Sequence, residues 1–168
     1  MSGKRESGAC SFSIVIPAFN EENYLGNTLD LVKSGMINIP ELKGEIIVVD
    51  NNSSDKTSEV GNSKGARVVF EPDNQISKAR NAGAKLAKGE YLIFLDADTH
   101  VSPELLELVL RKLRYDNCGG GGSTLVFDYN CNQIVFGSIL PRVWNFISTV
   151  LRLAAGSFIF CRKDFFDE

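Results

Sequence analysis

Two carboxylates one residue apart, Asp96 and Asp98, directly follow the apolar run Tyr91–Leu95. Carboxylate oxygens suit Mg²⁺ or Mn²⁺, which keep several waters and bridge to substrate phosphates. Such an ion would neutralise the charge that develops on a diphosphate leaving group. The alternative is a pair of acids in a turn before a helix, and an Asp-x-Asp sequence alone does not separate the two interpretations.

Three further polar clusters follow other apolar runs. They are Asn20-Glu21-Glu22, Asp50-Asn51-Asn52 and residues 74–81. In an open parallel sheet, ligands bind beyond the carboxyl ends of the strands. We therefore expect the four clusters to meet at one edge of a sheet. This convergence favours a functional role for Asp96 and Asp98 over a capping role.

Each of the other polar candidates also has a purely structural interpretation. Asp50 could cap the next helix, but Ser53 and Ser54 could do so instead and leave Asp50 for the base or ribose of a ligand. Arg80 is either a solvated charge or a ligand-facing cation, and its polar neighbours favour the second interpretation. His100, the single histidine, is interpreted as a satisfied residue at a helix start rather than as a metal ligand.

Apolar runs alternate with helical patterns along the first 115 residues. Strands are predicted at 12–17, 45–50, 66–70 and 91–95, and helices after Asn20, near 57–64, at 76–88 and from Ser102. Asn20 is the predicted cap and Gly35 the predicted stop of the first helix, while Pro103 occupies the first turn of the last. This alternation indicates an α/β fold, with a mostly parallel central sheet and helices on both faces.

The pattern changes after Cys118, where four glycines precede a strand-like segment at 124–127. Residues 143–161 are apolar and approach the length of about 20 residues that a membrane-spanning helix needs. Arg152 lies near the middle of that stretch. We therefore expect a buried or interfacial helix followed by a strand.

Composition excludes several classes of protein. The chain has 168 residues, 43% of them hydrophobic, and a formal net charge of −3, which excludes disordered and collagen-like chains and argues against a nucleic-acid partner. No two of its four cysteines are spaced as CxxC, so a zinc site is not expected. We expect the cysteines to be reduced thiols in a cytoplasmic protein. Residues 1–11 lack the apolar region of a signal peptide and are predicted to be a flexible tail before one domain, 12–168.

Four segments resemble family 2 glycosyltransferases, in the order in which that family has them. They are SIVIPAFNEENYL (13–25), EIIVVDNNSSDKT (45–57), KARNAGAKLAKGEYLIFLDADT (78–99) and AAGSFIFCRKDFF (154–166). The resemblance implies the A-type fold, the Rossmann-like fold of the nucleotide-diphospho-sugar transferases. The chain has neither GKS nor GKT after its glycines, nor a GxGxxG after its first strand, so P-loop and dinucleotide-binding readings are not favoured.

The resemblance also implies a ligand, a nucleoside-diphosphate sugar linked to UDP or GDP. By position, Pro17, Phe19 and Glu21 should lie beside the base and ribose, Asp50 should bind the base, and Arg80 and Asn81 should approach the phosphates. Asp96 should approach the ribose, Ala97 and Asp98 should also belong to the donor-binding residues, and Asp98 should hold Mn²⁺ or Mg²⁺. The implied partners are this donor and an acceptor saccharide or lipid-linked acceptor, as in polysaccharide or cell-wall synthesis. The apolar stretch leaves association with the inner face of a membrane open.

The implied reaction is a single inverting displacement by an acceptor hydroxyl, which requires a general base. In the family that base lies in a later motif, and residues 163–168 precede it, so no catalytic residue is assigned here. We expect a chain that is short at its C-terminus, with its donor half present and its acceptor half largely missing. A non-catalytic nucleotide-sugar-binding module and, more distantly, a nucleotidyltransferase are the alternatives.

Overall fold

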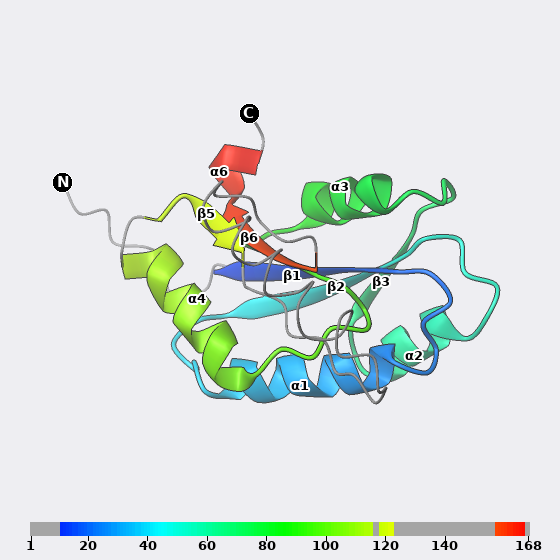
Figure 1. Cartoon of the computed structure of the whole chain (residues 1–168), viewed down its shortest axis with the longest axis horizontal. Helices are drawn as coiled ribbons and strands as arrows, with labels where there is room; N and C mark the ends of the chain where they lie inside the picture. The colour runs from blue at the N-terminus through cyan, green and yellow to red at the C-terminus, as the bar shows by residue number, and fades with distance from the viewer. Residues whose placement is uncertain (1–10, 116–117, 123–156, 167–168) are drawn as a thin grey trace, which may run out of the picture.

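A computed structural model of the protein describes residues 11–115, 118–122 and 157–166. Six strands form one sheet in the order β3-β2-β1-β4-β6-β5 (Figure 1). The first four pair in parallel, whereas β6 is antiparallel to both of its neighbours. Their bounds are β1 Phe12–Ala18, β2 Gly44–Asp50, β3 Arg67–Phe70, β4 Tyr91–Leu95, β5 Gly120–Gly122 and β6 Phe158–Arg162. The predicted mostly parallel sheet is confirmed.

Helices cover both faces of the sheet, as predicted (Figure 1). On one face lie α1 (Leu25–Ile37), α2 (Thr57–Ser63) and α4 (Pro103–Tyr115), and on the other lie α3 (Ile76–Leu86) and α6 (Lys163–Phe166). Successive strand residues point to opposite faces. Accordingly Ile14 and Ile16 pack into the core beside α1 and α4, while Val15 packs into the core beside α3.

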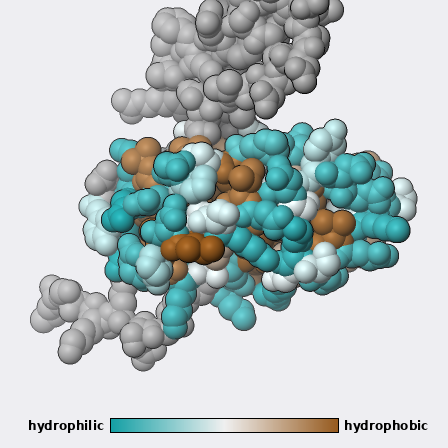
Figure 2. All heavy atoms as spheres, turned by 90° about the horizontal axis from the view of Figure 1, so that it is seen from below, coloured by the Kyte–Doolittle hydropathy of each residue, from teal (hydrophilic) through white to brown (hydrophobic). Residues whose placement is uncertain are grey.

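The outer surface of the layer formed by α1, α2 and α4 is mostly hydrophilic, and its apolar side chains are scattered (Figure 2). Exposed apolar residues on these elements include Ile37 and Leu108. Single apolar side chains of this kind are common on the surface of a folded domain. No helix within the described ranges combines the length and the apolar character that crossing a membrane would require.

The beginning of α1 differs from its prediction. Asn20 does not cap the helix, which begins at Leu25 after Tyr24. Asn20 has a left-handed φ of 56°, and its side-chain oxygen accepts a hydrogen bond from the backbone N of Ser54 at 2.8 Å. A residue 34 positions away along the chain therefore uses the oxygen that the local pattern assigned to the helix.

The end of α1 also differs, because Gly35 is an interior residue and not a stop. A Cβ atom at Gly35 would lie 2.9 Å from Cδ2 of Leu106, so the glycine allows α4 to approach α1 closely. The start of α4 agrees with its prediction. Ser102 Oγ accepts a hydrogen bond from the backbone N of Leu105 at 3.2 Å, and Pro103 is the first helical residue.

Beyond Cys118 the structure describes two short pieces of chain. The glycine run forms β5, which carried no strand signal, and β6 confirms the strand expected at the end of the apolar stretch. The predicted strand at 124–127 and the predicted helix in 143–156 lie outside the described residues. Residues 1–10 of the expected tail also lie outside the described residues. Ser11, the last residue of that tail, is bound to the sheet, because its carbonyl accepts hydrogen bonds from the backbone N atoms of Glu90 and Tyr91, both at 3.1 Å.

Candidate functional site

A cavity of about 320 Å³ lies at the carboxyl ends of the parallel strands. Its walls come from the ends of β1, β2 and β4 and from the connection between β3 and α3. All four sequence clusters therefore contribute to one site, as predicted from the strand ends. The lining residues are Pro17, Ala18, Phe19, Glu21, Asn51, Asn74, Ile76, Asp96, Ala97 and Asp98.

The two acids of the Asp-x-Asp segment have different surroundings. β4 ends at Leu95, and a turn follows in which the backbone N of Thr99 donates to the carbonyl of Asp96 at 3.0 Å. Asp96 is half-buried, and its Oδ1 lies 2.7 Å from Nη2 of Arg80. Asp98 is exposed and lines the cavity. Within the described part of the chain, no hydrogen bond reaches the Asp98 carboxylate, which therefore remains available to a ligand.

Three acids share this cavity, and two of them, Asp96 and Glu21, have raised pKa values. Burial raises the pKa of Asp96, the Arg80 guanidinium opposes that rise, and the charge of Asp98 adds to it. Burial also raises the pKa of Glu21, as do the charges of Asp98, Asp55 and Asp96. The negative charge is thus concentrated where a cation would relieve it.

Glu21 is held by a reciprocal network between the β1–α1 and β2–α2 loops. Its backbone N donates to Oγ1 of Thr57 at 2.8 Å, and the backbone N of Glu22 donates to Oδ2 of Asp55 at 3.1 Å. In return, the backbone N of Lys56 donates to Oε2 of Glu22 at 3.0 Å. Each loop thus satisfies backbone groups of the other, and Glu21 is fixed beside the cavity.

Asp50 is 5% exposed and does not line the cavity. Its Oδ1 accepts a hydrogen bond from the backbone N of Ser53 at 2.9 Å, and its Oδ2 accepts one from the hydroxyl of Ser58. Ser53 and Ser58 therefore hold the Asp50 carboxylate. The sequence instead predicts that Ser53 and Ser54 cap the next helix and leave Asp50 free for a ligand. Its neighbour Asn51 reaches the cavity instead, and base binding by Asp50 stays a prediction.

Arg80 and Asn81 lie on α3 and are not among the lining residues. Arg80 contacts the site through Asp96, and Asn81 is exposed, so their roles near the phosphates stay predictions. His100, interpreted from the sequence as a satisfied residue at a helix start, is exposed and contacts α1. Its Nε2 lies 3.0 Å from Nδ2 of Asn27 on α1.

Sequence reasoning assigned no individual role to Ala18, Asn51, Asn74 or Ile76, which also line the cavity. The side-chain amide of Asn51 lies 3.2 Å from Oδ1 of Asn74, which joins the second cluster to the third. The two asparagines carried a signal, because both stand in clusters that follow a predicted strand. Ile76 carried none beyond its place at the start of a predicted helix.

The cavity offers few metal ligands of its own. No group of three or more His, Cys, Asp or Glu side chains that could hold a metal occurs within the ranges that the structure describes. A caged structural metal therefore does not fit these residues. Asp98, with Glu21 nearby, fits a Mg²⁺ or Mn²⁺ ion that takes its remaining ligands from water and a bound diphosphate.

Similar proteins are found by sequence. Chondroitin synthase of Pasteurella multocida is 31% identical over 140 residues, which are 79% of this chain and 14% of that protein. Uncharacterized protein MJ1222 of Methanocaldococcus jannaschii is 31% identical over 152 residues, 87% of this chain and 59% of that protein. The chain thus spans less than two thirds of the length of either relative.

Solved structures share the fold. Glucosyl-3-phosphoglycerate synthase of Mycobacterium tuberculosis, in complex with Mn²⁺, UDP and glucosyl-3-phosphoglycerate, superposes with a TM-score of 0.64 at 19% identity and covers 94% of this chain and 58% of its own. TarS of S. aureus gives 0.60 at 24% identity, over 73% of this chain and 23% of its own. The fold is therefore the A-type glycosyltransferase fold. The family model for glycosyl transferase family 2 matches residues 13–166, nearly the whole sequence, and the chain belongs to that family.

Proposed function

We propose that the cavity binds a nucleoside-diphosphate sugar and that the protein transfers this sugar to an acceptor hydroxyl. The observation that carries the proposal is the meeting of Glu21, Asp96 and Asp98 in one cavity, with the Asp98 carboxylate open to a ligand. Relatives and neighbours support this donor class, since a TarS structure holds UDP and a second neighbour holds UDP with Mn²⁺.

Polar and apolar walls of the cavity suit different parts of such a donor. Phe19 and Ile76 are 44% and 53% exposed and line the cavity, so they offer apolar surface to a planar base. Asn51 and Asn74 offer amide groups to the base or ribose edge. Asp96, oriented by Arg80, is assigned to the ribose hydroxyls.

Asp98 is the proposed protein ligand of a divalent cation. When bound, Mn²⁺ or Mg²⁺ would supply positive charge beside the departing diphosphate. Asp98 and Glu21 would keep that ion at the carboxyl edge of the sheet, and the buried backbone around Ala97 would fix the position of Asp98.

The proposed reaction is an inverting displacement at the anomeric carbon, in which an acceptor hydroxyl attacks and the nucleoside diphosphate leaves. We assign no general base to residues 11–115, 118–122 or 157–166. A saccharide acceptor is proposed because a relative is named chondroitin synthase. A binding module without activity would bind the same donor, so release of UDP from UDP-sugars with Mn²⁺ separates the two functions.

The decisive binding experiment is calorimetry of UDP with the full chain, in Mn²⁺ and in EDTA. Wild type should bind more tightly with Mn²⁺, and Asp98→Asn should lose that difference. We expect a loss of at least about tenfold, since even outer-shell partners of a metal contribute that much to affinity. The matched control is Asp30→Asn, an exposed acid on α1, which should leave binding unchanged. Mn²⁺-dependent binding by Asp98→Asn that equals wild type would contradict the metal role.

A further inference from the structure

A buried hydroxyl on α1 anchors the turn that carries Asp98. Thr28 is 0% exposed, and its Oγ1 donates a hydrogen bond to the carbonyl of Ala97 at 2.7 Å. We propose that Thr28 is a positioning residue, which fixes the backbone at Ala97 and thereby directs the carboxylate of Asp98 into the cavity. This inference rests on the proposed donor and cation role of Asp98.

The other hydrogen bonds of this turn converge on Asp96. Its backbone N donates to the carbonyl of Ser157, its carbonyl accepts from the backbone N of Thr99, and its carboxylate pairs with Arg80. These contacts fix the first residue of the turn. Ala97, the next residue, is 4% exposed and connects Asp96 to Asp98. The hydrogen bond from the Thr28 hydroxyl holds the carbonyl of Ala97 in place.

A second contact from α1 is made with His100, two residues after Asp98 in the sequence. Nδ2 of Asn27 lies 3.0 Å from Nε2 of His100, and both side chains are exposed. Two consecutive residues of one helix therefore contact the chain just before and just after Asp98. Because α1 begins four residues after Glu21, the same rigid helix also relates Asp98 to the loop that bears Glu21.

Removing only the hydroxyl isolates this role. Thr28→Val keeps the shape and the β-branch of the side chain but leaves the Ala97 carbonyl, in a buried residue, without the hydrogen bond from Thr28. The turn must then shift to satisfy that carbonyl, and Asp98 moves with it. Thr28→Ser restores the hydroxyl and gives up only the methyl group.

The experiment measures UDP affinity of the full chain by calorimetry, with Mn²⁺ and with EDTA, and records the Mn²⁺ paramagnetic resonance spectrum in the presence of UDP. Thr28→Val should weaken Mn²⁺-dependent binding by about tenfold, the lower end of the range for partners that orient a metal ligand. Affinity in EDTA should stay within about twofold of wild type, since no base contact changes. Thr28→Ser should recover both the affinity and the spectrum.

Two further variants separate positioning from stability. Ser13→Ala removes another fully buried hydroxyl, at the amino ends of the strands, and should lower the melting temperature while leaving the Mn²⁺ dependence intact. Asn27→Ala removes the exposed contact to His100 and should weaken Mn²⁺-dependent binding in the same direction, by about threefold. Because this variant leaves the core untouched, it tests the inference even if Thr28→Val does not fold.

The outcomes distinguish the two proposals. Mn²⁺-dependent binding by Thr28→Val that equals wild type overturns the positioning role and leaves the proposed function standing. Equal losses with Mn²⁺ and with EDTA, or no recovery in Thr28→Ser, also overturn it, because they indicate general disruption of packing. A wild-type chain that binds UDP no better with Mn²⁺ than without it contradicts the metal role itself, and the inference falls with it.

Discussion

Two carboxylates at opposite edges of the sheet, those of Glu45 and Asp98, have opposite surroundings. At the amino edge, Oε1 of Glu45 accepts hydrogen bonds from the hydroxyl of Ser13 at 2.8 Å and from the backbone N of Lys88 at 2.6 Å. At the carboxyl edge, Asp98 faces the cavity, and within the described ranges its carboxylate receives no hydrogen bond. The carboxylate of Glu45 therefore holds a connection at the amino edge. At the carboxyl edge Asp50 and Asp96 are engaged by other side chains, and Asp98 is left for a ligand. Changes at the amino edge should alter stability alone.

The largest effect on stability is expected from Gly89→Ala at the amino edge. A Cβ atom at Gly89 would lie 2.3 Å from the carbonyl carbon of Phe12 and 2.5 Å from the backbone N of Ser13. Backbone atoms cannot move aside as a flexible side chain can, so the free energy of unfolding should fall by about 3 kcal/mol. Urea denaturation measures this loss, and UDP affinity with Mn²⁺ should be unchanged under conditions where the variant is folded.

Gly26→Ala is the matched control for that prediction. Its Cβ would meet only side-chain atoms, Cγ1 of Val60 at 3.6 Å and Cε of Lys64 at 3.7 Å, which is ordinary contact. Because alanine is the better helix former, this variant should gain up to about 1 kcal/mol. Equal losses in the two variants would show that close backbone approach at Gly89 is not the cause.

A smaller effect, visible as a pH dependence, is expected from Arg80→Met at the carboxyl edge. Burial already raises the pKa of Asp96 above its ordinary value of 3.8, and Arg80 opposes that rise. Without Arg80 the pKa rises further, so the folded state holds a proton that the unfolded state releases as the pH increases above 3.8. Stability relative to wild type should therefore fall between about pH 4 and neutrality, by about 1 kcal/mol.

Urea denaturation at several pH values in that window tests the prediction. Lys85→Met removes an exposed cation from the same helix, and its unfolding free energy should change with pH as that of wild type does. If the unfolding free energy of Arg80→Met changes with pH as it does in wild type and in Lys85→Met, then Arg80 does not control the ionisation of Asp96.

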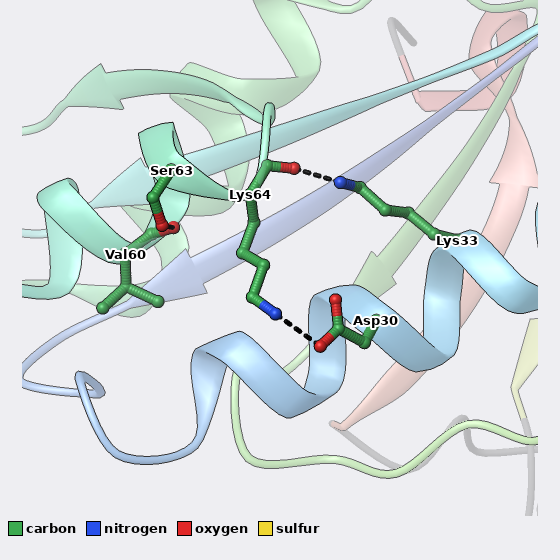
Figure 3. Close-up of polar contacts among 5 residues, drawn as sticks. All are labelled: Asp30, Lys33, Val60, Ser63 and Lys64. Carbon is green, nitrogen blue, oxygen red and sulfur yellow. Dashed lines mark hydrogen bonds and ion pairs between the residues drawn. The ribbon is translucent and has the colours of Figure 1, made fainter.

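The smallest effect is expected away from both edges, on the outside of the helical layer. Lys64 on the α2 side pairs with Asp30 of α1 at 2.5 Å, and the Nζ of Lys33 donates to the carbonyl of Lys64 (Figure 3). The Asp30 side chain is 56% exposed, so Asp30→Asn should cost no more than about 0.5 kcal/mol. The melting curves of wild type and Asp30→Asn should differ at low salt and coincide at high salt. A loss of stability in Asp30→Asn that persists at high salt would argue against an electrostatic origin.

Local patterns predicted the elements that local patterns control. The apolar runs located β1 to β4 within one or two residues, and the Ser102–Pro103 pair located the start of α4. The predictions that were wrong concerned residues with distant partners. Asn20 bonds to Ser54 rather than to its own helix, and Gly35 makes room for Leu106. The strand β5 carried no signal, because glycine has no side chain with which to show a pattern.

The site followed the same division. The parallel strands bring Glu21, Asp96 and Asp98 together, and their convergence could be predicted because it depends only on strand direction. The engagement of Asp50 by Ser58 could not be predicted, since it depends on how the first turn of α2 packs against the end of β2. The link from Thr28 to Ala97 spans 69 positions and leaves no trace in either local sequence.

The antiparallel strand β6 has a consequence for how this family can diversify. Gly122 of β5 pairs with Ile159, and Phe158 of β6 pairs with Leu95, so the chain departs after Gly122 and returns before Phe158 at the same border of the sheet. The intervening stretch can therefore lengthen, shorten or change composition between descendants without altering the pairing of the parallel strands.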